Sequence, residues 1–131
     1  MKYSLIALLV VFGLNVAGQD DPLAAGMKAA KASMDTLSKA EKKTGPQITA
    51  AGERLGSIYE NMIEYWRQRY TAPDAVKFSE QGKAAATMLA SASFAGDEAK
   101  VGEAMKILGG TCKSCHDAHR EKTPEGKYKI K

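Results

Sequence analysis

The chain lacks the features typical of nucleic-acid-binding and membrane-spanning proteins. Its formal net charge is only +4, and lysine and arginine form no dense cluster, so the composition does not favour nucleic-acid binding. After the first 18 residues no apolar run approaches the roughly 20 residues that a membrane-spanning helix needs. Internal repeats and low-complexity linkers are also missing. These absences favour one small globular domain.

Motifs of common enzyme chemistry are missing as well. The sequence contains no acid–base pair, no nucleophile motif and no phosphate-binding loop. We therefore do not expect an enzyme, and the remaining distinctive feature is a short motif near the C-terminus.

Cysteine occurs only twice, at Cys112 and Cys115, and His116 follows directly. The order C-x-x-C-H is the attachment pattern of c-type haem, in which two thiols become thioethers with the two vinyl groups of one haem. On a helix the three positions fall on one face, because three and four residues each make about one turn. We predict one haem c, covalently attached through Cys112 and Cys115, with His116 as an iron ligand.

Three other interpretations of this motif remain open. A disulfide would suit an exported protein, but a redox-active C-x-x-C normally opens a helix within a βαβ pattern, and no strand pattern precedes this one. A zinc site that includes His119 has suitable ligand types but lacks the usual long spacer between ligand pairs. In the third interpretation the match is accidental and the chain is a purely structural bundle.

The first residues, 1–18, have the pattern of a secretory signal peptide. Lys2 gives a positive start, an apolar run covers 5–14, and small residues up to Gly18 suit cleavage. Removal of this segment leaves a domain of 113 residues, 19–131, with a formal net charge of +3. We expect this mature domain in the periplasm and not inserted in the membrane, which agrees with a haem that bacteria attach outside the cytoplasm.

The mature domain has the periodicity of four amphipathic helices, with apolar residues recurring at spacings of three and four. In the first helix this seam consists of Leu23, Met27, Ala30, Met34 and Leu37. The expected helices cover about 21–43, 47–69, 73–94 and 97–122, with short glycine- or proline-containing connections between them. The pattern predicts an all-α, antiparallel four-helix bundle.

The predicted helix seams contain many small residues. They include Ala30, Ala51, Gly82, Ala85 and Ala92. A haem between the helices would supply apolar volume that such a seam lacks, so the composition agrees with the motif.

The helix order and the C-terminal motif resemble the class II cytochromes c, the cytochrome c′ and cytochrome c-556 group. That family ends in C-x-x-C-H-x-x-F-R. Cys112, Cys115, His116 and Arg120 match this ending, whereas His119 stands where an aromatic residue is usual. The resemblance implies a four-helix bundle with the haem held near the C-terminal end of the fourth helix. It also implies that Arg120 lies near the proximal haem pocket, and dimers are frequent in related bundles.

In this family the first helix supplies the residue opposite the proximal histidine, either a methionine ligand or a non-ligating apolar residue. Met27 and Met34 lie on the seam of that helix, about 10 Å apart along its axis. Antiparallel pairing places the start of the first helix beside the end of the fourth. We therefore predict Met27 as the second iron ligand, with Met34 nearly two turns too deep. Both methionines as core residues remain the alternative.

The sixth iron position separates two functions. Ligation by His116 and Met27 leaves no open position and indicates one-electron transfer. An open position would instead favour binding of small gases such as nitric oxide or carbon monoxide. Basic residues near the motif would steer a redox partner with an acidic docking surface, although a merely solvated surface is the alternative. They are Lys113, Arg120, Lys122, Lys127, Lys129 and Lys131.

Overall fold

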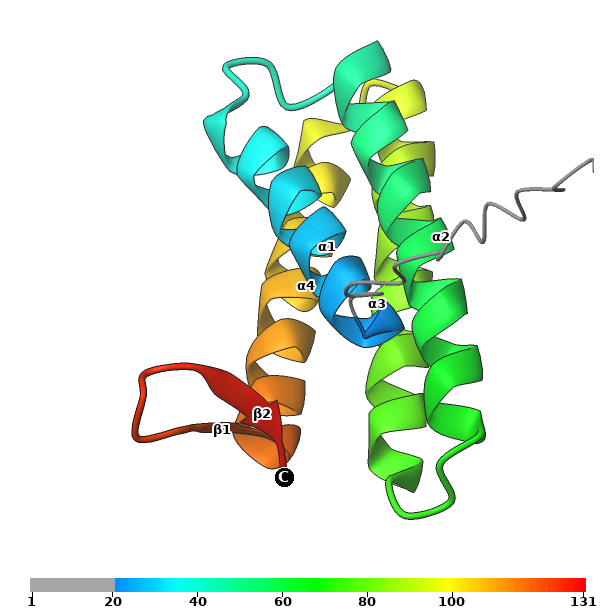
Figure 1. Ribbon diagram of the computed structural model, residues 1–131. Coiled ribbons are helices and arrows are strands. Elements are labelled where there is room, and N and C mark those ends of the chain that lie inside the picture. The colour runs from blue at the N-terminus through cyan, green and yellow to red at the C-terminus, as the bar shows by residue number, and fades with distance from the viewer. Residues whose placement is uncertain (1–20) are drawn as a thin grey trace, which may run out of the picture.

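The computed structural model describes residues 21–131, so the predicted signal peptide lies outside the described residues. Four helices are followed by two short strands, as Figure 1 shows. The elements are α1 (Pro22–Lys39), α2 (Pro46–Arg67), α3 (Pro73–Phe94), α4 (Glu98–His119), β1 (Arg120–Lys122) and β2 (Tyr128–Ile130). This arrangement confirms the predicted four-helix bundle. No helix in residues 21–131 is long and apolar enough to cross a membrane.

The helix starts follow from local chemistry that the sequence contains. Proline opens three of the four helices, where its fixed φ suits the first turn and its missing N–H costs nothing. The Asp21 carboxylate accepts a hydrogen bond from the Leu23 N–H at 3.1 Å, and Asp97 accepts one from the Lys100 N–H at 3.1 Å. Gly96 has a φ of +75°, a conformation that favours glycine after a helix end. Local side-chain and backbone chemistry thus fixes these helix ends.

Two helices end three or four residues earlier than the sequence predicts. The first was expected to continue to about Lys43, but α1 ends at Lys39. The Lys43 ammonium donates a hydrogen bond to the Leu37 carbonyl at 3.1 Å, which satisfies one of the open carbonyls at the helix end. The fourth was expected to continue to about Lys122, but α4 ends at His119 because β1 pairs with β2.

The helices pack mainly on their neighbours in sequence. Within residues 21–131, α1 packs against α2, α2 against α3, and α3 against α4, with no comparable packing between α1 and α4. The end of α4 lies at the end of the bundle where α2 ends and α3 begins, and α1 begins in the same half of the bundle but nearer its middle (Figure 1). Side chains from all four helices can therefore contribute to a site in this half.

Glycine allows α2 and α3 to approach closely. A Cβ at Gly52 would lie 2.8 Å from Leu89 Cδ2 and 2.9 Å from the Ala90 backbone nitrogen. A Cβ at Gly82 would overlap the ring of Tyr59. Small residues thus set the spacing of this helix pair.

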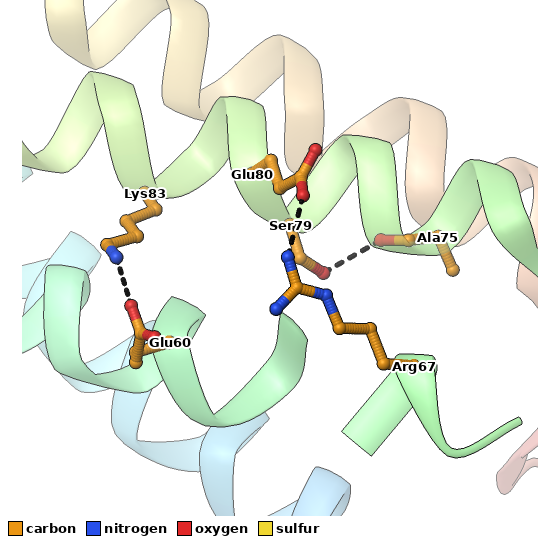
Figure 2. Close-up of polar contacts among 6 residues, drawn as sticks. All are labelled: Glu60, Arg67, Ala75, Ser79, Glu80 and Lys83. Carbon is orange, nitrogen blue, oxygen red and sulfur yellow. Dashed lines mark hydrogen bonds and ion pairs between the residues drawn. The ribbon is translucent and has the colours of Figure 1, made fainter. Parts of the chain in front are cut away.

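Ion pairs line the outer edge of the same interface. Figure 2 shows Glu60 of α2 paired with Lys83 of α3. Arg67 and Glu80 form a second pair at 3.2 Å, and the Ser79 hydroxyl donates to the Ala75 carbonyl within α3. Both ion pairs are exposed and contribute little to stability, so close packing holds α2 on α3.

The core contains the small residues that the sequence singled out. All five predicted seam positions are buried, namely Ala30, Ala51, Gly82, Ala85 and Ala92. On α4 the buried stripe includes Val101, Ala104, Leu108 and Thr111. Beyond Thr111 the same side of α4 carries only partly buried residues. The last two turns of α4 are therefore less enclosed than the rest of the helix.

The C-terminal tail forms a β-hairpin. Arg120 pairs with Ile130, Glu121 with Lys129, and Lys122 with Tyr128. The hairpin lies beside the end of α4 (Figure 1), and the Lys131 N–H donates to the His119 carbonyl at 3.0 Å. The tail is thus held by strand pairing between 120–122 and 128–130 and by this hydrogen bond to the end of α4.

Candidate haem site

The candidate attachment residues occupy the less enclosed end of α4. Cys112, Cys115 and His116 are all partly buried, and both cysteines are free thiols. Two of the alternative interpretations of the motif therefore gain no support. The thiols form no disulfide, and no cluster of three or more His, Cys, Asp or Glu side chains in residues 21–131 could hold a metal ion.

Cys112 contacts a buried phenol from another helix. The Tyr59 hydroxyl of α2 lies 3.4 Å from the Cys112 sulfur, within hydrogen-bonding distance, and only 6% of Tyr59 is exposed. Burial, and then the hydrogen bond with Cys112, raises the pKa of Tyr59 above its ordinary value. The phenol therefore keeps its proton and remains a hydrogen-bond donor at neutral pH.

Burial also sets the protonation of the other two residues. It raises the pKa of the Cys115 thiol, and the neighbouring Cys112 and Asp74 act in the same direction. It lowers the pKa of His116, and the positive charge of Arg120 lowers this pKa further. Although Asp117 acts in the opposite direction, the net effect favours the neutral imidazole, the form in which a ring nitrogen can bind iron.

His119 joins the end of α4 to the start of α3. Its Nε2 lies 2.9 Å from the Asp74 carboxylate, and its ring centroid lies 5.4 Å from that of Trp66. Only 15% of the His119 side chain is exposed. Asp74 thus provides a hydrogen-bonding partner for Nε2. The sequence left the role of this histidine open, because its partner lies 45 residues away.

The first turns of α1 lie beside the part of α2 that contacts the motif. A Cβ at Gly26 would lie 3.6 Å from Met62 Cε and 3.8 Å from Ile58 Cγ2. Tyr59, the next residue after Ile58, contacts Cys112. The beginning of α1 and the cysteine turn of α4 are thus at one level of the bundle.

The two methionines of α1 lie at different levels. Met27 follows Gly26 directly, and Met34 lies about 10 Å farther along the helix, away from the motif. Both are partly buried and pack against the core. The structure brings Met27 to the level of the motif and leaves Met34 remote from it.

Arg120 is exposed and forms the first residue of β1. Its N–H donates to the His116 carbonyl, and its guanidinium lies 4.0 Å from the centroid of the Tyr128 ring. After burial, its positive charge is the second cause that lowers the pKa of His116. The side chain itself packs on the hairpin.

The residues at this end of the bundle fit a c-type haem. Two thiols are available for the vinyl groups, a neutral imidazole for the iron and a methionine thioether at the same level. A surface hollow of about 730 Å³ lies at the opposite end, between α1 and α2, and its lining contains no thiol or imidazole.

Comparison with known proteins agrees with this chemistry. The family model described as "Cytochrome C'" matches residues 17–120. A cytochrome c′ from Pararhodospirillum photometricum is 52% identical over 48 residues, which are 37% of this chain and 35% of that protein. The aligned part thus spans about a third of the relative's length. No solved structure gives a significant match. Because the family model covers most of the chain, the protein belongs to the cytochrome c′ family of class II c-type cytochromes, a family of haem proteins.

Proposed function

We propose that this protein is an exported monohaem cytochrome that transfers single electrons through a haem ligated by His116 and Met27. Cys112 and Cys115 would hold the haem by thioether bonds. The observation that carries the proposal is the common level of Met27 and the cysteine turn, which follows from the contacts of Gly26 and Tyr59 with neighbouring helices.

The direction of the side chains strengthens this assignment. A helical side chain leans toward the N-terminus of its own helix. Since α1 and α4 run in opposite directions, the side chain of His116 leans toward Cys112, and that of Met27 leans toward the level of His116. These directions favour an approach of the two potential ligands. Met34 leans the same way as Met27 but starts about two turns too far away.

The proposed ligands account for electron transfer without other chemistry. The haem supplies the one-electron centre, and a histidine and a methionine as axial ligands raise its reduction potential. With both positions taken, neither ligand has to leave when the charge of the iron changes. Cytochromes c′ are in general haem carriers, and the proposed ligation leaves no position for a substrate.

Gas binding is the second candidate function, and the match to cytochrome c′ favours it. In that case Met27 would remain a packing residue, and the iron would keep an open position for nitric oxide or carbon monoxide. The two candidate functions differ in whether Met27 binds the iron.

Optical spectra of the haem-loaded protein distinguish these candidates. We expect the oxidised protein to show the weak red absorption band typical of a methionine–ferric iron bond, and the reduced protein to bind carbon monoxide poorly. Met27→Ala should abolish the band and admit carbon monoxide, whereas the matched Met34→Ala should change neither. A high-spin spectrum with ready carbon monoxide binding in the unmodified protein would overturn Met27 ligation and favour gas binding.

Export and partner choice are parts of the same proposal. Cleavage after residue 18 would leave the domain 19–131 in the periplasm, and the intact mass of the purified protein tests this. Residues 112–131 contain six basic and three acidic side chains, so they account for the whole net charge of the mature domain. This distribution supports a redox partner with an acidic docking surface. A homodimer also remains a proposal, which sedimentation would test.

A further inference from the structure

Tyr59 connects three helices at the candidate site. Its backbone belongs to α2, its ring lies on Gly82 of α3, and its hydroxyl lies 3.4 Å from the sulfur of Cys112 on α4. No other phenol in residues 21–131 forms a hydrogen bond with either cysteine.

The position of the hydroxyl is fixed by packing. Tyr59 is 6% exposed, and any side chain at position 82 would overlap its ring. A tyrosine side chain has only two main torsions, so a ring fixed on one face leaves its hydroxyl little freedom. The oxygen is therefore held at the Cys112 sulfur.

We propose that Tyr59 is a positioning residue for haem attachment, whose hydroxyl holds the Cys112 sulfur toward the bundle interior while Gly82 provides the space for its ring. This inference rests on the proposed function, since it requires that Cys112 receives a haem vinyl group. In that addition the sulfur bonds to the inner vinyl carbon and the thiol hydrogen moves to the outer one. The vinyl double bond becomes a single bond, and no further reactant is needed.

After haem attachment, the hydrogen bond can form only with Tyr59 as the donor and the Cys112 sulfur as the acceptor. A thiol can donate or accept, but a thioether sulfur carries no hydrogen and can only accept. In the finished protein the Tyr59 hydroxyl must therefore donate. Within the described chain Cys115 has no such hydroxyl contact, so loss of the phenol should affect Cys112 selectively.

The test compares Tyr59→Phe with Tyr65→Phe. Tyr65 is a suitable control because it lies on the same helix and its buried hydroxyl has no hydrogen-bond partner in residues 21–131. Each full-length chain is expressed with haem-attachment machinery and sampled early. Free thiols are alkylated, and the share of chains that carry haem on Cys115 and an alkylated Cys112 is measured by mass spectrometry.

We expect Tyr59→Phe to raise this singly attached share about two- to tenfold, the range that one hydrogen bond can produce. Tyr65→Phe should match the unmodified protein. If the unmodified chain acquires no haem, the proposed function fails. If it acquires haem normally and Tyr59→Phe has an unchanged share, the inference is overturned, even when Tyr59→Phe lowers the melting temperature.

Gly82→Ala tests the second part of the inference. The added methyl group should displace the ring and raise the singly attached share as Tyr59→Phe does. In the double variant the two changes should not add, because both remove the same contact. If the two increases in the singly attached share add up in the double variant, Gly82 does not act through Tyr59, and the role proposed for Gly82 is overturned.

Discussion

On α1, the apolar periodicity of the sequence predicts some buried side chains correctly and misses others. On α1 the predicted seam included Leu23, Ala30 and Leu37, and all three are buried. Ser33 was not predicted, yet its exposure is 0% and its hydroxyl has no hydrogen-bond partner within residues 21–131. A pattern that counts only apolar residues cannot identify such a position, because the hydroxyl group is enclosed by packing alone.

Ser33→Ala is therefore expected to stabilise the protein. The substitution removes an unpaired hydroxyl from the core, and the free energy of unfolding should rise by about 1 kcal/mol or more. Urea unfolding followed by circular dichroism measures this. Ser38→Ala on the exposed side of α1 is the control, since it shares the gain in helix propensity without the burial. Equal effects of the two substitutions would contradict the explanation.

Only some residues of the candidate site could be predicted from the sequence. The spacing of Cys112, Cys115 and His116 is local and can be read from the sequence, and it leads to a haem. Tyr59 and Asp74 lie 53 and 45 residues from their partners in the motif helix. No short-range pattern relates residues this far apart, so these contacts required the packed bundle.

At the scale of elements, the closeness of α2 and α3 depends on which glycine faces the interface. The sequence predicted α3 with the bounds that the structure has, and α2 to within two residues. Gly52 and Gly56 lie one turn apart on α2, but only Gly52 contacts the backbone of α3, whereas nothing approaches a Cβ at Gly56 within 4 Å. Position 56 therefore has room for a side chain, whereas position 52 does not.

This contrast predicts opposite effects of the same substitution. Gly52→Ala should lower the free energy of unfolding by about 1–3 kcal/mol, because the methyl group would overlap Leu89 and the backbone at Ala90. Gly56→Ala should raise it by about 0.5–1 kcal/mol through helix propensity. Thermal and urea unfolding of the two variants give the comparison. A stabilised Gly52→Ala would mean that α2 and α3 can separate at little cost.

The hairpin explains why the end of α4 was predicted too late. Residues 120–122 are charged and suit the surface of a helix as well as an exposed strand. Pairing with residues 128–130 decides between these conformations, and the turn at Gly126, with a φ of +79°, brings the strands together. Helical periodicity contains no information about such a partner.

At the scale of the whole molecule, charge is distributed unevenly. The last twenty residues carry a net charge equal to that of residues 19–131 as a whole, and the hairpin places much of it beside the candidate haem site. Lys129 pairs with Glu121 and Lys113 with Asp117, while Lys122 and Lys127 have no ion-pair partner among the described residues. The latter two lysines therefore contribute a positive field at this end.

Small redox reagents can measure this field without a natural partner. Lys122→Gln combined with Lys127→Gln should slow electron exchange with the anion ferricyanide about threefold or more at low ionic strength. The same double variant should exchange electrons faster with a cationic cobalt complex. Both differences should shrink as salt rises, since charges are screened beyond about 10 Å at 0.1 M.

The matched control replaces Lys39 and Lys42, which are exposed at the opposite end of the bundle. It removes the same charge far from the motif and should alter both rates less. Equal effects of the two double variants would assign the rates to net charge alone and would leave the acidic-partner proposal without support.

The packing of each helix on its sequence neighbour has a kinetic consequence. Connections of a few residues join the helices, so little chain entropy is lost before native contacts form. Domains with such local contacts fold in microseconds to milliseconds. The chain is thus expected to form its bundle quickly, and under the proposed function haem delivery would have to compete with folding for access to the C-terminal segment. The yield of loaded protein then depends on two rates, one of which is fixed by topology.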